Sequence, residues 1–163
     1  MLSIAPEHKL RGMLFWLMGD LSQAGTPWIA LAVLVAALVA SVPFARELNL
    51  LARGHDTAQS LGVDVRRLRY TVYAIASLVT AMAVTSAGSI GFVGLIVPHL
   101  VRLAIGNDQR LLLPASVLAG GALLTFADTL ARTVVAPQQL PVGVLTALIG
   151  VPVFLFLLAR HRQ

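Results

Sequence analysis

Three groups of polar side chains in this chain have types and spacings that could do chemistry. The first is a polar segment, residues 46–69, that lies between apolar stretches. The second is His99 and Arg102, just after Pro98, and the third is Asp128 and Arg132. Side chains three or four positions apart share one face of a helix, so each pair can bind a partner or form an internal contact.

None of these groups has the pattern of a catalytic or metal-binding site. The chain has no cysteine, and its four histidines, at positions 8, 55, 99 and 161, are too scattered to form a zinc site by spacing. Neither a phosphate-binding glycine loop, nor a His-Glu metal helix, nor a nucleophile elbow occurs. We therefore expect no catalytic residue, no metal and no cofactor, and we expect any ATP hydrolysis to belong to another chain.

The composition indicates an integral membrane protein. Hydrophobic residues make up 58% of the 163 residues and charged residues 12%, against roughly a quarter charged in soluble domains. The net charge of +5 comes mainly from arginines spread between apolar runs, which argues against a nucleic-acid partner. The lipid bilayer is the expected surrounding.

We predict an all-α bundle of about five transmembrane helices, because the apolar runs approach the ~20 residues that cross a bilayer. A shorter apolar patch, residues 14–18, is read as an interfacial helix or the end of a missing span. This divides the chain into an external or interfacial segment, residues 1–27, and a membrane part, residues 28–163. The five predicted spans are residues 28–45, 72–87, 90–105, 111–130 and 141–158.

The second and third spans are the ambiguous part of this topology. Gly88, Gly91, Gly94 and Pro98 all disfavour an uninterrupted helix. Residues 72–105 could form one bent helix with a re-entrant piece, or two spans with a turn near residues 87–89. The charge distribution favours two spans, since one span would move the C-terminal arginines outside.

The positions of lysine and arginine predict the orientation. An external N-terminus places nine basic residues inside and three outside, with a cytoplasmic C-terminus and a cytoplasmic loop at residues 46–69. The inside set is Arg46, Arg53, Arg66, Arg67, Arg69, Arg102, Arg110, Arg160 and Arg162, and the outside set is Lys9, Arg11 and Arg132.

The cytoplasmic loop is patterned as well as polar. Leu50, Leu51, Ala58 and Leu61 can line one side of a short helix pair that is broken at Gly54 and again at Gly62. Asp56 or Thr57 is expected to cap the second helix. Such a pair can dock in a groove of a soluble partner, and the alternative is an ordinary solvated loop.

The two other groups also have two readings each. Pro98 frees a backbone carbonyl one turn earlier, so the backbone here needs protein or water nearby. His99 and Arg102 then form a polar pair near the cytoplasmic end, unless Arg102 only snorkels and His99 is structural. Asp128 and Arg132, near the outer end of the fourth span, either pair as an interfacial anchor or contact an external partner.

Several segments resemble one family closely. These are residues 15–22 (FWLMGDLS), 48–65 (LNLLARGHDTAQSLGVDV), 88–116 (GSIGFVGLIVPHLVRLAIGNDQRLLLPAS), 127–132 (ADTLAR) and 140–158 (LPVGVLTALIGVPVFLFLL). The chain is similar over nearly its whole length to FecCD or BtuC-like permease subunits of ABC importers for iron siderophores, haem and vitamin B12. The similarity covers only the C-terminal half of such a permease.

The resemblance implies a function and partners. The chain would be the permease half that lets such a cargo enter the cytoplasm through the bacterial inner membrane. It would work with a separate ABC ATPase, an external substrate-binding protein, and a second permease copy or the missing N-terminal half. The family's coupling loop corresponds to Gly54, Asp56, Ala58, Leu61 and Gly62, and its outer-face arginine, which meets a carboxylate of the binding protein, corresponds to Arg132.

Two other classes remain as alternatives. A truncated fragment could be a membrane scaffold without a transport role, and substitutions at Asp56 and Gly62 would then leave transport unaffected. An ion-coupled secondary carrier would need acids within the membrane, where only Asp128 is near the interior of a span. The cargo, whether siderophore, haem or cobalamin, is left open by the sequence.

Overall fold

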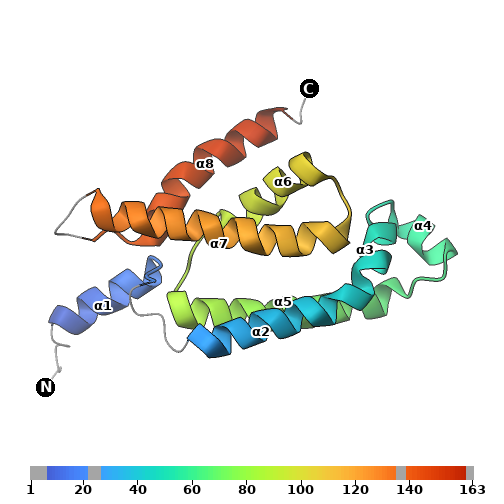
Figure 1. The fold of residues 1–163 in the computed structure, drawn as a ribbon, viewed down its shortest axis with the longest axis horizontal. Helices are drawn as coiled ribbons and strands as arrows, with labels where there is room; N and C mark the ends of the chain where they lie inside the picture. Colours follow the sequence, from blue (N-terminus) through green and yellow to red (C-terminus); the bar gives the residue numbers. More distant parts are fainter. Residues whose placement is uncertain (1–6, 22–26, 135–138, 161–163) are drawn as a thin grey trace, which may run out of the picture. The chain divides into compact units, whose positions relative to one another are not determined.

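The computed structural model describes residues 7–21, 27–134 and 139–160, and every regular element in these ranges is helical. Figure 1 shows the order of the elements along the chain. They are α1 (Glu7–Leu17), α2 (Pro27–Ser41), the 3-10 turn η1 (Val42–Phe44), α3 (Ala45–Leu51), α4 (His55–Ser60), α5 (Val65–Ala87), α6 (Val93–Ile105), α7 (Gln109–Thr133) and α8 (Val142–Arg160). The predicted all-α class is confirmed.

Each predicted span coincides with a helix, and three of them reach membrane-spanning length. The long apolar stretches are Pro27–Leu51, Val65–Ala87 and Gln109–Thr133, of 25, 23 and 25 residues. The apolar helices Val93–Ile105 and Val142–Leu155 are shorter. At 1.5 Å per residue, the 13 residues of α6 rise about 20 Å, less than the ~30 Å hydrocarbon core.

The long helices bury very little of their apolar surface within the chain. Only 6% of the best apolar window in Pro27–Leu51, 0% of that in Val65–Ala87 and 11% of that in Gln109–Thr133 is buried. Trp28, Val39 and Leu118 are 75%, 66% and 76% exposed. An apolar surface of this extent is unfavourable in water, so lipid or other membrane helices must cover it.

The chain divides into two compact units. Unit 1 comprises Met1–Gly25, Val84–Ile96 and Gly120–Gln163, and unit 2 comprises Thr26–Ala83 and Val97–Ala119. The helices α5, α6 and α7 each continue from one unit into the other. The two units are described separately below.

Unit 1 is organised around close backbone contacts made by glycines. The amide of Asp20 donates to the carbonyl of Ala87 over 3.0 Å, which joins the segment after α1 to the end of α5. A Cβ on Gly88 would collide with the carbonyl oxygen of Trp16, and one on Gly143 with that of Met18. The apolar patch at residues 14–18 therefore ends in a turn packed between the end of α5 and the start of α8.

The core of unit 1 joins the last turns of α7 to the first turn of α8. Ala127, Ala131 and Val142 are almost completely buried there, and the amide of Leu140 donates to the carbonyl of Ala131 over 3.2 Å. The small alanine side chains allow close approach of the two segments, which is how helices associate in lipid. This packing fixes the end of α7, which carries Asp128 and Arg132.

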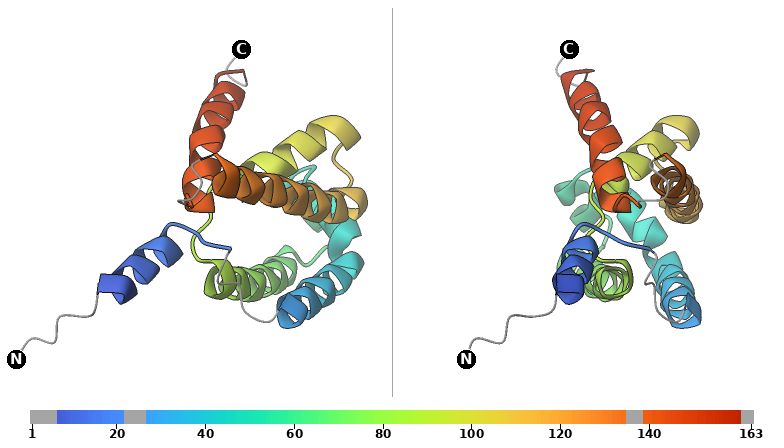
Figure 2. Two further views of the ribbon diagram at one scale, coloured as in Figure 1. Left: turned by 60° about the vertical axis from the view of Figure 1, so that its left-hand side comes forward. Right: turned by 90° about the vertical axis from the view of Figure 1, so that its left-hand side faces the viewer.

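Unit 2 contains α2, the first turns of α5, the last turns of α6 and the first turns of α7, with α3 and α4 at one end. Its parts of α2 and α5 run alongside one another in both sets of views (Figures 1 and 2). An apolar recess of about 330 Å³ lies among α2, α5 and α7. The contact of α3 with α4 and the hydrogen bonds of Asn49 in α3 to Asp108 and Gln109 position the polar segment that begins at residue 46.

Candidate functional site

Most of the loop predicted at residues 46–69 folds as the predicted pair of short helices, α3 and α4, whereas residues 65–69 already belong to α5. Gly54 separates them with φ +126°, and Gly62 ends the second with φ +83°. Residues that carry a side chain rarely adopt these backbone angles, so glycine is favoured at both positions. The predicted breaks at Gly54 and Gly62 are confirmed.

The predicted cap of α4 is wrong. The N-cap is Gly54, which has no side chain to form a cap, and α4 begins at His55. Asp56 and Thr57 therefore lie inside the first turn instead of preceding it. The reason is the backbone of Gly54, which has a positive φ and takes the N-cap position, so that the helix begins one residue before Asp56.

Each helix of the pair has one buried alanine, Ala45 in α3 and Ala58 in α4, and the pair has an exposed outer side. Ala58 is 0% exposed, whereas Leu61 is 61% exposed. Asp56 and Gly62 are exposed as well. Leu50 and Leu61 line a recess of about 640 Å³ with Gly62. Ala58 thus holds α4 in place, and Asp56, Leu61 and Gly62 are available to a partner.

Asp64, which sequence reasoning did not select, caps the helix that follows. Its carboxylate accepts a hydrogen bond of 3.0 Å from the amide of Arg67, and its carbonyl accepts one of 2.9 Å from the amide of Leu68. An aspartate just before a helix is the usual signal for such a cap. The cap fixes where the pair of short helices ends and α5 begins.

A second unselected contact joins α3 to the start of α7. The side-chain amide of Asn49 donates to Oδ1 of Asp108 over 2.8 Å, and its oxygen accepts from the amide of Gln109 over 2.9 Å. The amide of Arg110 donates to the same Oδ1 over 3.1 Å. The hydrogen bond from Asn49, followed by that from Arg110, holds the pKa of Asp108 below its usual value.

The break before α6 lies where the glycines predicted it. α5 ends at Ala87, Gly88 has φ +72°, and α6 starts at Val93. Phe92 also has a positive φ, +66°, and a Cβ on Gly150 of α8 would collide with it. Sequence reasoning missed Phe92 because its role depends on this contact with a distant helix.

The helix breaks expected at Gly94 and Pro98 do not occur, because α6 runs from Val93 to Ile105 and contains both residues. Pro98 lies inside the helix, His99 is half-buried and Arg102 is exposed. Gly91 precedes the helix and Gly94 lies in its first turn, and a Cβ at either would meet nothing within 4 Å. Close backbone contact is therefore not the reason for glycine at these two positions.

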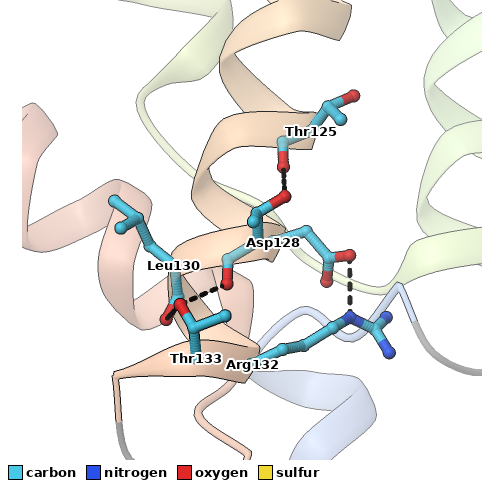
Figure 3. Close-up of polar contacts among 6 residues, drawn as sticks. Thr125, Asp128, Leu130, Arg132 and Thr133 are labelled. Atoms are coloured by element: carbon cyan, nitrogen blue, oxygen red, sulfur yellow. Dashed lines mark hydrogen bonds and ion pairs between the residues drawn. The ribbon is translucent and has the colours of Figure 1, made fainter.

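Asp128 and Arg132 form the predicted pair on one face of α7. The Nε of Arg132 donates to Oδ2 of Asp128 over 2.8 Å. The side chain of Arg132 is 40% exposed and that of Asp128 is 25% exposed. Figure 3 shows the guanidinium beside the carboxylate, with its two terminal nitrogens beyond the contact. The negative charge of Asp20 also acts on Arg132. The arginine is thus oriented but remains accessible.

Within the described ranges, no group of three or more His, Cys, Asp or Glu side chains is arranged to hold a metal. The loop residues Gly54, Asp56, Ala58, Leu61 and Gly62 belong to unit 2, with His99 and Arg102. Arg132, Gly91 and Gly94 belong to unit 1. Each group includes exposed charged side chains on helices, Asp56 and Arg102 in unit 2 and Arg132 in unit 1, which suits binding to partner proteins.

The fold is that of an ABC transporter permease. It matches a solved inward-facing structure of a metal-chelate type ABC transporter with a TM-score of 0.78 and 35% identity. The match covers 94% of this chain and 50% of the other. Residues 1–160 match the FecCD transport family, and the chain belongs to that family.

Curated relatives agree with this assignment. The chain is 51% identical to the cobalamin import system permease protein BtuC of Halobacterium salinarum, over 96% of this chain and 42% of the relative. It is 44% identical to the hemin transport system permease protein HmuU of Yersinia pestis (98% and 48%). It is 42% identical to the Fe(3+) dicitrate transport system permease protein FecD of Escherichia coli (99% and 51%). The chain spans about half the length of these relatives.

Proposed function

We propose that this chain is the C-terminal half of the permease of an ABC importer, and that it helps move a metal-chelate cargo into the cytoplasm. The observation that carries the proposal is the pair of short helices in a FecCD family member: α3 is the last part of the apolar stretch Pro27–Leu51, and α4 follows it. A short exposed helix beside a membrane span is suited to docking on a soluble subunit.

The proposed energy source is a separate ABC ATPase that docks on this helix pair. The buried Ala58 fixes α4, and the amide of Val63 donates to its carbonyl over 3.0 Å. A push on the exposed Asp56, Leu61 and Gly62 would then move the pair as one body. Closure of the ATPase dimer would shift the spans between conformations that open to either side of the membrane.

The proposed external partner is a substrate-binding protein that docks at Arg132. Asp128 orients the guanidinium through Nε, which leaves the terminal nitrogens for a bidentate contact with a carboxylate of the partner. The orientation that agrees with this role has an external N-terminus and a cytoplasmic C-terminus in the inner membrane. The excess of arginine in residues 46–69, 102–110 and 160–162 supports it.

The assembly would be completed by a second permease copy or by the other half of the permease. The large exposed apolar area of the three long helices supports a membrane partner of this kind. The proposed role of Gly91 is to help separate α5 from α6, and those of His99 and Arg102 are to form a polar pair near the cytoplasmic end of α6.

The proposed cargo class is a metal chelate: cobalamin, haem or a ferric siderophore. The names of the relatives support this class, because cobalamin, hemin and ferric dicitrate all hold a metal ion in an organic chelate. The permease would leave the cargo chemically unchanged.

The test is uptake in a strain that lacks its own permeases of this family. The chain is expressed with the other permease half, the ATPase and the binding protein from the same genome, and labelled cyanocobalamin, haem and ferric citrate are supplied separately. We expect accumulation of one of them, and we expect its loss when the catalytic glutamate of the ATPase is replaced.

Two results would overturn the proposal. Accumulation that persists with the inactive ATPase and stops when the ion gradient is collapsed would indicate a secondary carrier. An assembled complex that accumulates none of the three would indicate a scaffold without transport.

A further inference from the structure

We propose that Asn49 is a positioning residue that ties α3 to the start of α7, so that movement of the ATPase-facing helices is passed directly to α7. The inference rests on the proposed function, because it assigns a route for the push on α3 and α4. The inference is based on a contact between residues that lie far apart in the chain, and no sequence motif predicts this contact.

The contact uses both ends of one side-chain amide. The nitrogen of Asn49 donates to Oδ1 of Asp108 over 2.8 Å, and the oxygen accepts from the backbone of Gln109 over 2.9 Å. An amide held at both its donor and its acceptor end cannot rotate without losing a hydrogen bond. The link therefore resists displacement of α3 relative to residues 108–109.

Asp108, which accepts the hydrogen bond from Asn49, is itself bound to the first turn of α7. Its carboxylate accepts from the amide of Arg110 over 3.1 Å, and its carbonyl accepts from the amide of Leu112 over 2.8 Å. The residue is therefore the N-cap of α7. Because Asn49 also binds the amide of Gln109, the first residue of α7, a displacement of α3 pulls on the helix itself.

The surroundings indicate that hydrogen bonds make this connection. Asn49 and Asp108 border an open recess of about 380 Å³ together with Ala52, Arg53 and Asn107. Water can enter such a space, so the link is not a buried apolar contact that any side chain of similar size would preserve. Exchange of the donor and acceptor groups should therefore affect it in a predictable way.

The experiment measures cargo delivered per ATP hydrolysed in proteoliposomes that contain the full importer. Asn49→Asp removes the donor and places a second carboxylate beside Asp108, so we expect a severalfold loss of cargo per ATP. The double variant Asn49→Asp with Asp108→Asn restores one donor and one acceptor across the link, and the asparagine side chain introduced there can still cap α7. We expect this variant to recover most of the coupling.

The matched control is Asn107→Asp, which adds the same charge at an exposed position in the same recess. We expect cargo per ATP close to that of the unchanged protein. A similar loss in this control would overturn the proposal, because local charge would then be the cause.

Thermal stability separates positioning from simple helix capping. If Asn49→Asp lowers Tm but leaves cargo per ATP unchanged, Asn49 only stabilises the start of α7 and the proposal is wrong. Failure of the double variant to recover coupling would also contradict it. Failure of the proposed function is distinguishable, because the unchanged protein would then show no ATP-driven uptake at all.

Discussion

The Nε of Arg132 lies 2.8 Å from Oδ2 of Asp128, one turn earlier on α7. The last turns of this helix are fixed by the nearly complete burial of Ala127 and Ala131. The guanidinium is therefore oriented on a rigid support while 40% of the arginine side chain remains exposed. A docking contact needs this combination, because a side chain already ordered loses less entropy on binding.

Reversal of the charge at Arg132 should weaken docking of the binding protein. Arg132→Glu would place two carboxylates together and remove the bidentate donor, so we expect Kd to rise by about tenfold or more. Arg132→Lys keeps the charge without the planar fork and should lie in between. Binding is measured on detergent-solubilised importer with purified binding protein, and an unchanged Kd in Arg132→Glu would remove this residue from the docking surface.

Replacement of Gly62 should uncouple ATP hydrolysis from uptake. The space around it is open, but its φ of +83° is unfavourable for a side chain, and Gly62→Val would disturb the end of α4 at a cost of roughly 1–2 kcal/mol. We expect ATP hydrolysis to continue while uptake falls. Gly121→Ala, a helical site with open space around it, is the control, and normal uptake in Gly62→Val would rule out the assignment.

Replacement of Gly88 should destabilise unit 1. A Cβ at this position would collide with the backbone of Trp16, and its φ of +72° adds strain. Because backbone cannot yield as a flexible side chain can, we expect Gly88→Ala to lose about 2 kcal/mol or more of stability. Gly91→Ala, in the same turn with nothing within 4 Å, is the control. Equal Tm values for the two variants would contradict the close approach.

The link at Asp108 should weaken in acid. Hydrogen bonds from Asn49 and Arg110 lower the pKa of Asp108 in the folded chain. The ionised carboxylate therefore contributes fully to stability above the pKa of aspartate in the unfolded chain, which is about 4. That contribution is lost as the pH falls through the lower folded-state pKa. Hydrogen exchange at the amides of Gln109 and Arg110, expressed relative to the intrinsic exchange rate at each pH, should therefore accelerate below about pH 4. In Asp108→Asn this acceleration should be absent, and its persistence there would assign it to another group.

The features that follow from local chemistry could be predicted from the sequence. The break after Ala87 follows from glycine at positions 88 and 91. The separation of α3 from α4 follows from Gly54, and the end of α4 follows from Gly62. The pairing of Asp128 with Arg132 follows from helical spacing. In each case the residues that determine the structure are neighbours in the chain.

The features that depend on distant contacts could not be predicted. The sequence predicts Asp56 or Thr57 as the cap of α4, whereas the N-cap is Gly54, because neighbouring residues do not determine the backbone angles of a glycine. The approach of Gly88 to Trp16 and the link between Asn49 and Asp108, 59 positions apart, depend on how helices pack. Such contacts require the tertiary structure.

The central claim, that α3 and α4 face the ATPase on the cytoplasmic side, can be measured by site-directed cross-linking. Because the chain has no cysteine, single cysteines at the exposed positions Gln59 on α4 and Thr133 on α7 give an unambiguous background. In the assembled importer, Gln59→Cys should cross-link to the ATPase and should not react with a membrane-impermeant thiol reagent applied to intact cells. Thr133→Cys should react with this reagent and should not cross-link to the ATPase. Labelling of Gln59→Cys from outside, with no cross-link to the ATPase, would contradict the account.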